Sequence, residues 1–452
     1  MQNETKLKGR TMISITQDEK ITRLPVAELK TSAEAFLGPL LRELPDKRLR
    51  VVGVLMVLGI LAGQSPLITQ MARGVREGSQ YVLDMARRMY RFIWNRRLSS
   101  QGLQVGLYRL GQQTVARYKP AALVVALDPV NFEKPYTHDL EGVSTVYKSS
   151  PPDRKGKGRL ARGYPALTAC VVNLPEPVLT YAQWFSYTRQ FLSENAELQA
   201  AVSTTRQLYP EYDLCFVGDS GLDDQKLFDY IRGTDSTFII RVGHDERLVD
   251  VYNERLDCLE RETLTDLIAT MPPLLKLEAS FTHARQTRTA QVGLGWLKLY
   301  LPSDERALWL LAIHDPDLDR DIGLLTNCPI VTSDDAQSVF VTWRYRPHIE
   351  HTYRLDQEAG LDVEDLRVQS LEHMRRVFLM VLVAAAFLYH LDQTWQPEAL
   401  HWLRSLGGKL GTLSDLDGFY LLLAGIRAVL VTAATLLFVR SYPFPRPKGT
   451  CG

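Results

Sequence analysis

The sequence of 452 residues is poor in cysteine, and its five cysteines follow no metal-binding or redox pattern. They are scattered, without a Cys-x-x-Cys pair or a Cys/His ligand spacing, which excludes the zinc-finger and thioredoxin-like classes. Four of them lie in or beside apolar runs and are expected to be small core residues of a protein in a reducing cytosol. The first twenty residues contain no apolar segment, so we expect no secretory signal. Internal repeats and long low-complexity segments are also lacking.

Net charge is almost lacking as well, at +1, but the two parts of the chain differ strongly. Residues 1–120 hold 20 Lys and Arg against 9 Asp and Glu, a charge of about +11, whereas the remainder hold 33 against 43, about −10. A basic segment beside an acidic one is typical of a protein that binds a polyanion and carries out chemistry with carboxylates. A chance asymmetry between two domains is the alternative interpretation.

Two apolar stretches near the C-terminus raise the question of a membrane. Residues 377–391 form an uncharged run of about fifteen residues, which is short for a bilayer span. Residues 419–439 are longer, but Arg427 lies in their middle, and their apolar side chains recur all round a helix, as in a buried core helix. We therefore expect no membrane contact, with an integral membrane protein as an alternative.

Three short helices are predicted in the basic N-terminal segment, over residues 51–62, 67–73 and 80–94. Ser65 is a suitable N-cap and Pro66 suits a first helical position, so the chain is expected to turn sharply between the first two helices. The third helix carries a basic cluster that we expect to contact DNA: Arg87, Arg88 and Arg91. The pattern is typical of a helix-turn-helix module. A helical bundle with a solvated basic face is the alternative.

Beyond residue 120 the pattern changes to buried strands, two of which end in a carboxylate. Residues 121–128 (AALVVALD) end in Asp128, and residues 214–218 (LCFVG) are followed by Asp219. A carboxylate beside a core is costly unless it is paired or binds a metal, and strand ends are where α/β folds assemble their sites. If the two strands are neighbours, the acids converge, and oxygen-only ligation favours Mg²⁺ or Mn²⁺. The alternative is that both acids merely cap strand ends.

The remaining pattern predicts an α/β core interrupted by a β-rich segment. Further strands are predicted over residues 142–147, 164–172, 237–242 and 322–327, and helices over 181–207, 223–232 and 333–346. Alternating apolar residues within 243–320 predict antiparallel β structure there. This segment would be an insertion between the core strands and a later helix.

Two segments resemble the acid-bearing blocks of bacterial insertion-sequence transposases of the DDE type. Residues 217–221 (VGDSG), followed by a helix and a strand ending in Arg241, are similar to the second-acid block. Residues 343–350 (WRYRPHIE) are similar to the third-acid block, whose signature is Tyr-x2-Arg-x3-Glu-x6-Lys. Arg346 and Glu350 hold the Arg and Glu positions of that signature at the right spacing. The resemblance covers about residues 120–395 and, with the helical N-terminal domain, most of the chain.

The resemblance implies an RNase H-like mixed sheet flanked by helices, with an α-helical N-terminal domain and a β-rich insertion before the third acid. The implied parts are a DNA-binding domain at 1–118, a catalytic core at 119–242 and 321–395, the insertion at 243–320 and a C-terminal helical region at 396–452. Asp128, Asp219 and Glu350 would hold two Mg²⁺ or Mn²⁺ ions and catalyse cleavage and strand transfer of double-stranded transposon-end and target DNA. A homodimer in the active complex and a cytoplasmic, nucleoid-associated location in a bacterium are implied too.

Two positions depart from the family signature. Trp343 stands where the signature has Tyr, and Gln357 stands where it has Lys; the family uses both positions, with the Arg, to hold DNA phosphates. Arg354, one turn after Glu350, is a cation that could replace the Lys. The expected DNA contacts of this part of the chain are Arg346, Trp343, Arg354, Arg241 and, in a Gly-rich loop, Lys155, Lys157, Arg159 and Arg162. The complete triad favours an active enzyme, and a domesticated or inactive DNA-binding relative is the alternative.

Overall fold

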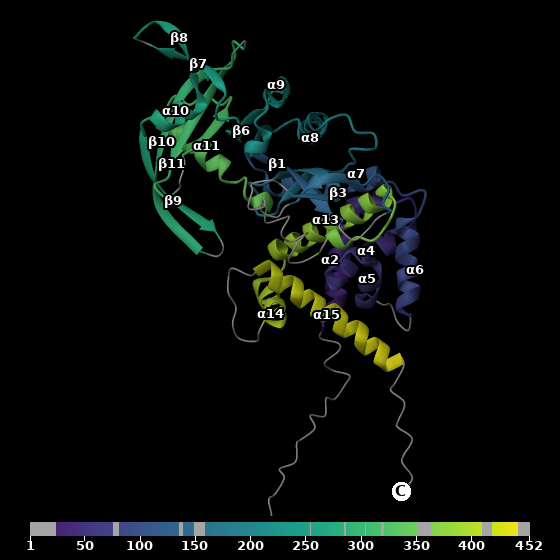
Figure 1. Cartoon of the computed structure of the whole chain (residues 1–452). Coiled ribbons are helices and arrows are strands. Elements are labelled where there is room, and N and C mark those ends of the chain that lie inside the picture. The colour runs from purple at the N-terminus through teal and green to yellow at the C-terminus, as the bar shows by residue number, and fades with distance from the viewer. Residues whose placement is uncertain are drawn as a thin grey trace, which may run out of the picture.

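The computed structural model describes a mixed α/β protein in which one large sheet is combined with many helices (Figure 1). It describes residues 24–75, 81–134, 139–148, 159–253, 255–283, 286–302, 304–317, 321–350, 361, 363–408 and 418–441. The prediction of an α/β fold with a mixed sheet and flanking helices is confirmed at this level.

Twelve strands in the described residues form a single sheet. They are β1 (Ala122–Glu133), β2 (Ser144–Tyr147), β3 (Leu160–Val171), β4 (Val178–Trp184), β5 (Asp213–Gly218), β6 (Thr237–Arg241), β7 (Leu248–Asn253), β8 (Cys258–Thr263), β9 (Leu275–His283), β10 (Gln286–Tyr300), β11 (Ala307–His314) and β12 (Ile322–Thr326). Their order is β2-β3-β1-β5-β6-β12-β11-β10-β7-β8, with β4 also paired to β3 and β9 to β10. The β1–β5 and β5–β6 pairs are parallel, and the other pairs are antiparallel.

Helices from both ends of the chain gather on one side of the strands β1 and β3 (Figure 1). The N-terminal helices are α2 (Val26–Phe36), α3 (Gly38–Glu43), α4 (Lys47–Gly63), α5 (Ile68–Gly74), α6 (Val82–Ile93) and α7 (Ser100–Tyr118), and the C-terminal ones are α13 (Leu371–Thr394), α14 (Pro397–Gly407) and α15 (Gly418–Ser441). Helix α4 packs against both α13 and α15. The remaining longer helices are α8 (Glu194–Leu208), α9 (Gln225–Gly233), α10 (Leu264–Thr270) and α11 (Ser333–Trp343). The two ends of the chain therefore share one helical layer.

The middle of β1 is buried on both faces, which explains its uninterrupted apolar sequence. Val124 and Ala126 belong to the core that contains the terminal helices and α11. Val125 and Leu127 belong to the core on the other face, with α8, α9 and α10. Successive side chains of a strand point to opposite faces. Asp128 therefore continues the series of Val124 and Ala126 and points to the α11 and α13 side.

Helices α13 and α15 contain the two apolar stretches that raised the membrane question. Both are long and apolar enough to cross a bilayer, and the bent pair of α4 and α5 would pass the same test as one broken span. In α13, 83% of the most apolar window is buried inside the protein, so the core accounts for its composition; in α15 only 39% is buried. The backbones of α14 and α15 approach closely at Gly425, where a Cβ atom would lie 1.9 Å from Leu403 O.

One predicted element is wrong in its first half. The segment 181–207 was expected to be a single helix, but residues up to Trp184 belong to β4, and α8 begins only at Glu194. Thr180, Ala182 and Trp184 alternate into the core as β4 pairs with β3. Pairing with a strand that is distant in sequence overrides the local pattern there.

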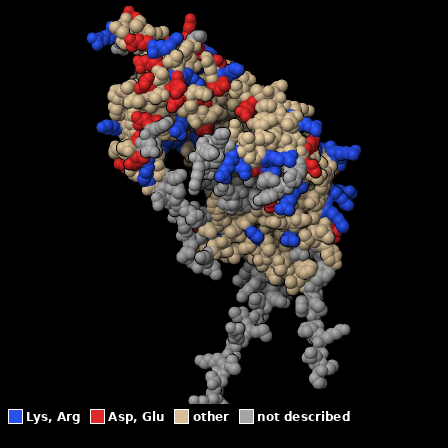
Figure 2. Space-filling view, in the orientation of Figure 1, with Lys and Arg blue, Asp and Glu red and all other residues tan. Residues whose placement is uncertain are grey.

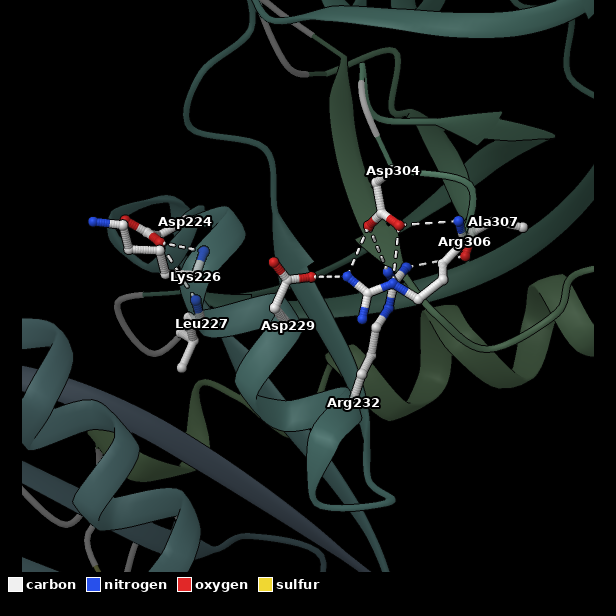
Figure 3. A network of polar contacts seen from close by, with 8 residues as sticks. All are labelled: Asp224, Lys226, Leu227, Asp229, Arg232, Asp304, Arg306 and Ala307. Atoms are coloured by element: carbon white, nitrogen blue, oxygen red, sulfur yellow. Dashed lines mark hydrogen bonds and ion pairs between the residues drawn. The ribbon is translucent and has the colours of Figure 1, made fainter.

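The predicted β-rich insertion extends the sheet instead of forming a separate one, because β12 pairs with both β6 and β11. A polar network attaches its β10–β11 turn to α9 (Figure 3). Arg232 of α9 donates to Asp304 Oδ2 (3.2 Å) and to Ala307 O (3.0 Å). Arg306 pairs with both Asp304 and Asp229. The network fixes the insertion relative to the helix that follows the second acid-bearing strand.

Candidate active site

The pairing of β1 with β5 places Asp128 beside Asp219. In this parallel pair Ala126 is in register with Val217, so the residues two positions further along are neighbours as well. Val217 belongs to the same core as Ala126, so side-chain alternation directs both carboxylates to the same face. The structure thus brings together the two acids. The prediction that the first strand ends at Asp128 is wrong, because pairing with β3 continues β1 to Glu133, whereas Asp219 directly follows β5 as predicted.

Arg346 lies between these acids and Glu350. Its Nη2 atom is 3.6 Å from Asp128 Oδ1 and 3.3 Å from Asp219 Oδ2, while its Nη1 atom donates to Glu350 Oε1. Arg346 and Glu350 are in contact, as their i,i+4 spacing predicts. Three carboxylates from three separate segments therefore converge on one guanidinium.

The acids differ in their exposure to water. The side chain of Asp128 is 15% exposed, whereas those of Asp219 and Glu350 are 42% and 45% exposed. Burial raises the pKa of Asp128 to about 7, because desolvation outweighs the opposing attraction of Arg346, and the negative charges of Asp219 and Glu350 raise it further. One guanidinium does not fully compensate the three negative charges at this site.

The neighbouring acids Asp223 and Asp224 have structural roles instead. Asp223 is buried, and its Oδ2 atom accepts from the backbone N–H groups of Gly243 and His244, both at 2.9 Å. Asp224 caps α9 by accepting from Lys226 N (2.7 Å). Asp219 Oδ1 accepts from its own turn, leaving Oδ2 directed at Arg346. Geometry thus separates Asp219 from two acids that sequence alone could have confused with it.

The approach of the β6–β7 loop to the Asp219 turn requires a glycine. A Cβ atom on Gly243 would lie 2.1 Å from Ser220 O, closer than any real contact. The same loop supplies the two N–H groups that bind Asp223. A side chain at position 243 would push the loop away and displace the turn that carries Asp219.

The remaining predicted contacts are dispersed. Trp343 ends α11 and packs partly against the core, and its Nε1 atom is buried without a hydrogen-bond partner among the described residues. Arg241 ends β6 and is exposed, as are Arg159 and Arg162 at the start of β3. The remaining predicted residues lie outside the described part of the chain: Lys155, Lys157, Arg354 and Gln357. Among the predicted DNA contacts that lie in described segments, Arg346 alone is grouped with the three acids.

A separate site, lined mainly by arginines among its charged residues, lies between α4 and α6. A hollow of about 460 Å³ is lined by two of the predicted arginines, Arg88 and Arg91, together with Arg48 and Arg97. Figure 2 shows Lys and Arg side chains gathered over α6, at the right of the view. Arg48 lies outside the basic cluster that the sequence predicts, and Arg97 lies just beyond the helix that carries this cluster. The sequence pattern that could have identified both residues is the pair of basic clusters at 47–50 and 96–97, which fold beside α6.

The donor set at Arg346 suits a hard divalent cation in its chemistry. All three groups are carboxylates, the ligands that Mg²⁺ and Mn²⁺ prefer. As the side chains stand, however, no group of three or more His, Cys, Asp or Glu in the described part of the chain is arranged to hold a metal ion. The carboxylates surround Arg346 instead. The donor chemistry of the three acids therefore fits a divalent cation, but the positions of their side chains in this structure do not.

Comparisons with known proteins add little to this geometry. No protein-family model matches the sequence, and no curated protein matches it. Among solved structures, the chain is similar to the piggyBac transposase in its synaptic complex with hairpin DNA, with a TM-score of 0.42 and 9% sequence identity. The alignment covers 95% of this chain and 82% of that one. The case for a function therefore rests on the geometry of the site itself.

The raised pKa of Asp128 predicts a pH-dependent stability of the metal-free protein. Because the folded-state pKa of about 7 exceeds the ordinary 3.8, the folded state binds more protons, and stability falls as pH rises between these values. We expect Asp128→Asn to match the wild type near pH 4 and to exceed it at pH 8 by up to about 4 kcal/mol. Urea unfolding of both proteins in EDTA from pH 4 to 8 measures this difference. A difference that does not change with pH would contradict the assignment.

Proposed function

We propose that the protein is a DDE-type transposase, a metal-dependent enzyme that cleaves DNA and joins the cut end to a target. The observation that carries the proposal is the convergence of Asp128, Asp219 and Glu350 on Arg346. The segments around Asp219 and Glu350 are those that resemble the acid blocks of bacterial insertion-sequence transposases. Asp128, which rested on its position alone in the sequence, is in reach of the same guanidinium.

The strand order supports an RNase H-like catalytic core. Strands β4, β3, β1, β5 and β6 lie side by side in that order, with an antiparallel part, β4-β3-β1, followed by a parallel part, β1-β5-β6. Asp219 follows the carboxyl end of β5, and Asp128, in the middle of β1, lies two residues past the last β1 residue that pairs with β5, at the same end of this parallel pair. Ligands of open α/β sheets bind outside that end. Five adjacent strands of this order and direction favour an RNase H-like fold. They also argue that the acids meet because of this fold and not by chance.

In this proposal Asp128, Asp219 and Glu350 hold Mg²⁺ or Mn²⁺, with two ions expected. Bound metal would activate a water or a 3′-hydroxyl and stabilise the leaving oxygen of a phosphoryl transfer. When Arg346 leaves the acids, a DNA phosphate would be its new partner, because a guanidinium can bind a phosphate with two parallel hydrogen bonds. It would then orient the scissile phosphate. Trp343, three residues before Arg346, remains a candidate contact of the DNA end.

Double-stranded DNA is the proposed partner. The arginine-lined hollow between α4 and α6 presents several cations on one surface, which suits the phosphate backbone of a duplex. Cleavage at two transposon ends requires two active sites, so a homodimer is the proposed active complex. A bacterial cytoplasm, in association with the nucleoid, is the proposed location.

A DNA-binding relative without cleavage activity is the second candidate. The observation that favours it is Arg346, which occupies the space between the three acids and would compete with a metal ion for them. The two candidates differ in one respect, namely whether a divalent cation can displace Arg346.

Magnesium-dependent nicking of supercoiled plasmid DNA tests catalysis. We expect the wild type to nick, and Asp219→Asn to lower the rate at least about 100-fold because a metal ligand is lost. The matched control is Asp224→Asn, five residues away, since Asn also caps helices well. Nicking that is equally fast in the Asp219 variant would contradict the proposal. Absence of nicking in a wild type that binds DNA would favour the second candidate.

Replacement of Arg346 tests two proposed roles of this residue: competition with a metal ion for the three acids, and binding of the scissile phosphate. We expect Arg346→Gln to bind Mg²⁺ more tightly in the absence of DNA, by about tenfold, because a competing cation is removed. We expect the same variant to nick more slowly than the wild type, because a phosphate contact is lost. Calorimetric titration with Mg²⁺ and the plasmid assay measure the two effects. Weaker Mg²⁺ binding by the variant would contradict this role.

The salt dependence of DNA binding tests the arginine-lined hollow. We expect the double variant Arg88→Ala/Arg91→Ala to bind all duplexes more weakly and to reduce the slope of log K against log salt by about 2, one for each lost phosphate contact. The matched control is Arg255→Ala/Arg261→Ala at the β7–β8 hairpin. Fluorescence anisotropy with a labelled duplex from 50 to 300 mM NaCl measures both slopes. Equal slopes in the two variants would contradict the assignment.

A further inference from the structure

The segment that carries Arg346 and Glu350 does not continue α11 as an α-helix. Helix α11 ends at Trp343, three residues before Arg346. Beyond it, five backbone N–H groups each donate to the carbonyl three residues before: those of Tyr345, Arg346, His348, Ile349 and Glu350. Such bonds have poorer geometry than α-helical ones, and a stretch of them often marks a hinge or a strained segment. The position of these residues, which we call the Arg346 turn (344–350), therefore depends on contacts with other parts of the chain.

The two ends of the Arg346 turn are held by different elements. At the Glu350 end, Ile349 is buried in the core that contains α11. His348 Nδ1 lies 3.1 Å from Val172 O, just after β3. At the α11 end, the side chain of Arg344 reaches the β9–β10 hairpin of the insertion. Arg346 lies between these two attachments.

Arg344 is attached to the hairpin through a carbonyl and an aromatic ring. Its Nη2 atom donates to the backbone carbonyl of Ser280 on β9. Its guanidinium carbon lies 5.2 Å from the ring centre of Phe281 and 5.6 Å from that of Phe340. A guanidinium over an aromatic face at such distances is attracted by the ring. These partners are all neutral, so removal of Arg344 would leave none of them as an unpaired charge.

Phe281 is itself held from the neighbouring strand. It lies opposite Arg288 of β10, whose guanidinium carbon is 4.9 Å from the centre of the same ring. Arg288 Nη1 donates to Asp315 Oδ1 (3.1 Å), and the side chain of Asp315 is only 1% exposed. Phe281 also packs against the core on the α11 side of the sheet. A continuous series of contacts thus runs from the end of β11 through the hairpin to the Arg346 turn.

We propose that Arg344 is a positioning residue for Arg346. The inference rests on the proposed function, in which Arg346 exchanges the three acids for a DNA phosphate. That exchange moves a long side chain, and its backbone has to stay in place because two parallel hydrogen bonds to a phosphate are directional. Arg344 holds the backbone by joining the turn to the β9–β10 hairpin. It acts through Arg346 and not on the DNA.

The contacts of Arg344 argue against a direct role on DNA. Its side chain lies over two rings and is fixed by a carbonyl, and the residue is only partly exposed. It would have to give up these contacts to reach a phosphate. Arg367, whose side chain is 74% exposed, is a guanidinium without that constraint.

A double-mutant cycle with Arg346 tests the proposal in the plasmid nicking assay at saturating DNA and Mg²⁺. We expect Arg344→Ala to lower the rate about tenfold and to leave duplex affinity in Ca²⁺ unchanged, because Arg346 is misplaced. In an Arg346→Gln background the same change should alter the rate by less than about twofold, because its effect passes through Arg346. Phe281→Leu should behave like Arg344→Ala. The matched control is Arg261→Ala, which removes a guanidinium paired with Asp250 on the β7–β8 hairpin.

Hydrogen–deuterium exchange of the metal-free protein tests the attachment without any activity. We expect the amides of residues 345–350 to exchange about tenfold faster in Arg344→Ala and in Phe281→Leu than in the wild type. Exchange in β1 and β5 should not change, and Arg261→Ala should match the wild type throughout. Unchanged exchange of 345–350 in both variants would overturn the proposal.

The outcomes separate this inference from the proposed function. Weaker duplex binding by Arg344→Ala, together with a rate loss that persists in the Arg346→Gln background, would identify Arg344 as a direct DNA contact and overturn its positioning role. A wild type that does not nick would overturn the catalytic proposal. The exchange experiment then decides the inference alone, since faster exchange confined to the Arg346 turn would still support the attachment by Arg344.

Discussion

The parallel pairing of β1 with β5 is the constraint on which the candidate site depends. The register of Ala126 with Val217 makes Asp128 and Asp219 neighbours, and the alternation of side chains turns both to the same face. A shift of one residue in this register would turn one carboxylate to the opposite core. Burial of both strands on both faces fixes the register, since a shift would also move apolar side chains out of their core positions.

Convergence of three acids creates an electrostatic problem that Arg346 solves only in part. Like charges at short range repel, and burial of Asp128 adds a desolvation cost that raises its pKa to about 7. One guanidinium among three carboxylates leaves a net negative charge if all three are ionised. A site of this kind attracts cations. In the proposed function a divalent cation replaces Arg346 among the acids, and the guanidinium, which also pairs well with phosphate, then binds the DNA instead.

The surroundings of the site are built by segments from the whole chain. Asp223 holds the β6–β7 loop, Gly243 lets that loop approach the Asp219 turn, and the Arg232 and Arg306 network attaches the β insertion to α9. These contacts fix the second acid from several directions. The helical layer covers one face of the sheet, and 83% of the apolar window of α13 is buried there. Helix α15 differs, because only 39% of its apolar window is buried within the described part of the protein.

The sequence by itself determined the local features of this protein. The uninterrupted apolar runs predicted β1 and β5 as buried strands, and the ends of these runs in the sequence marked Asp128 and Asp219. The i,i+4 spacing predicted the contact between Arg346 and Glu350. Such features depend on neighbours within a few residues, so a periodicity or a spacing is enough to find them.

Only the tertiary structure decided which distant segments meet. It made residues 178–184 a strand, because β3 lies beside them. It joined the insertion to the core sheet through β12 and gave Asp223 a structural role that its neighbour Asp219 lacks. It placed Arg346 among all three acids. These outcomes depend on strand order and register, which are set by burial across the whole molecule and leave no local pattern in the sequence.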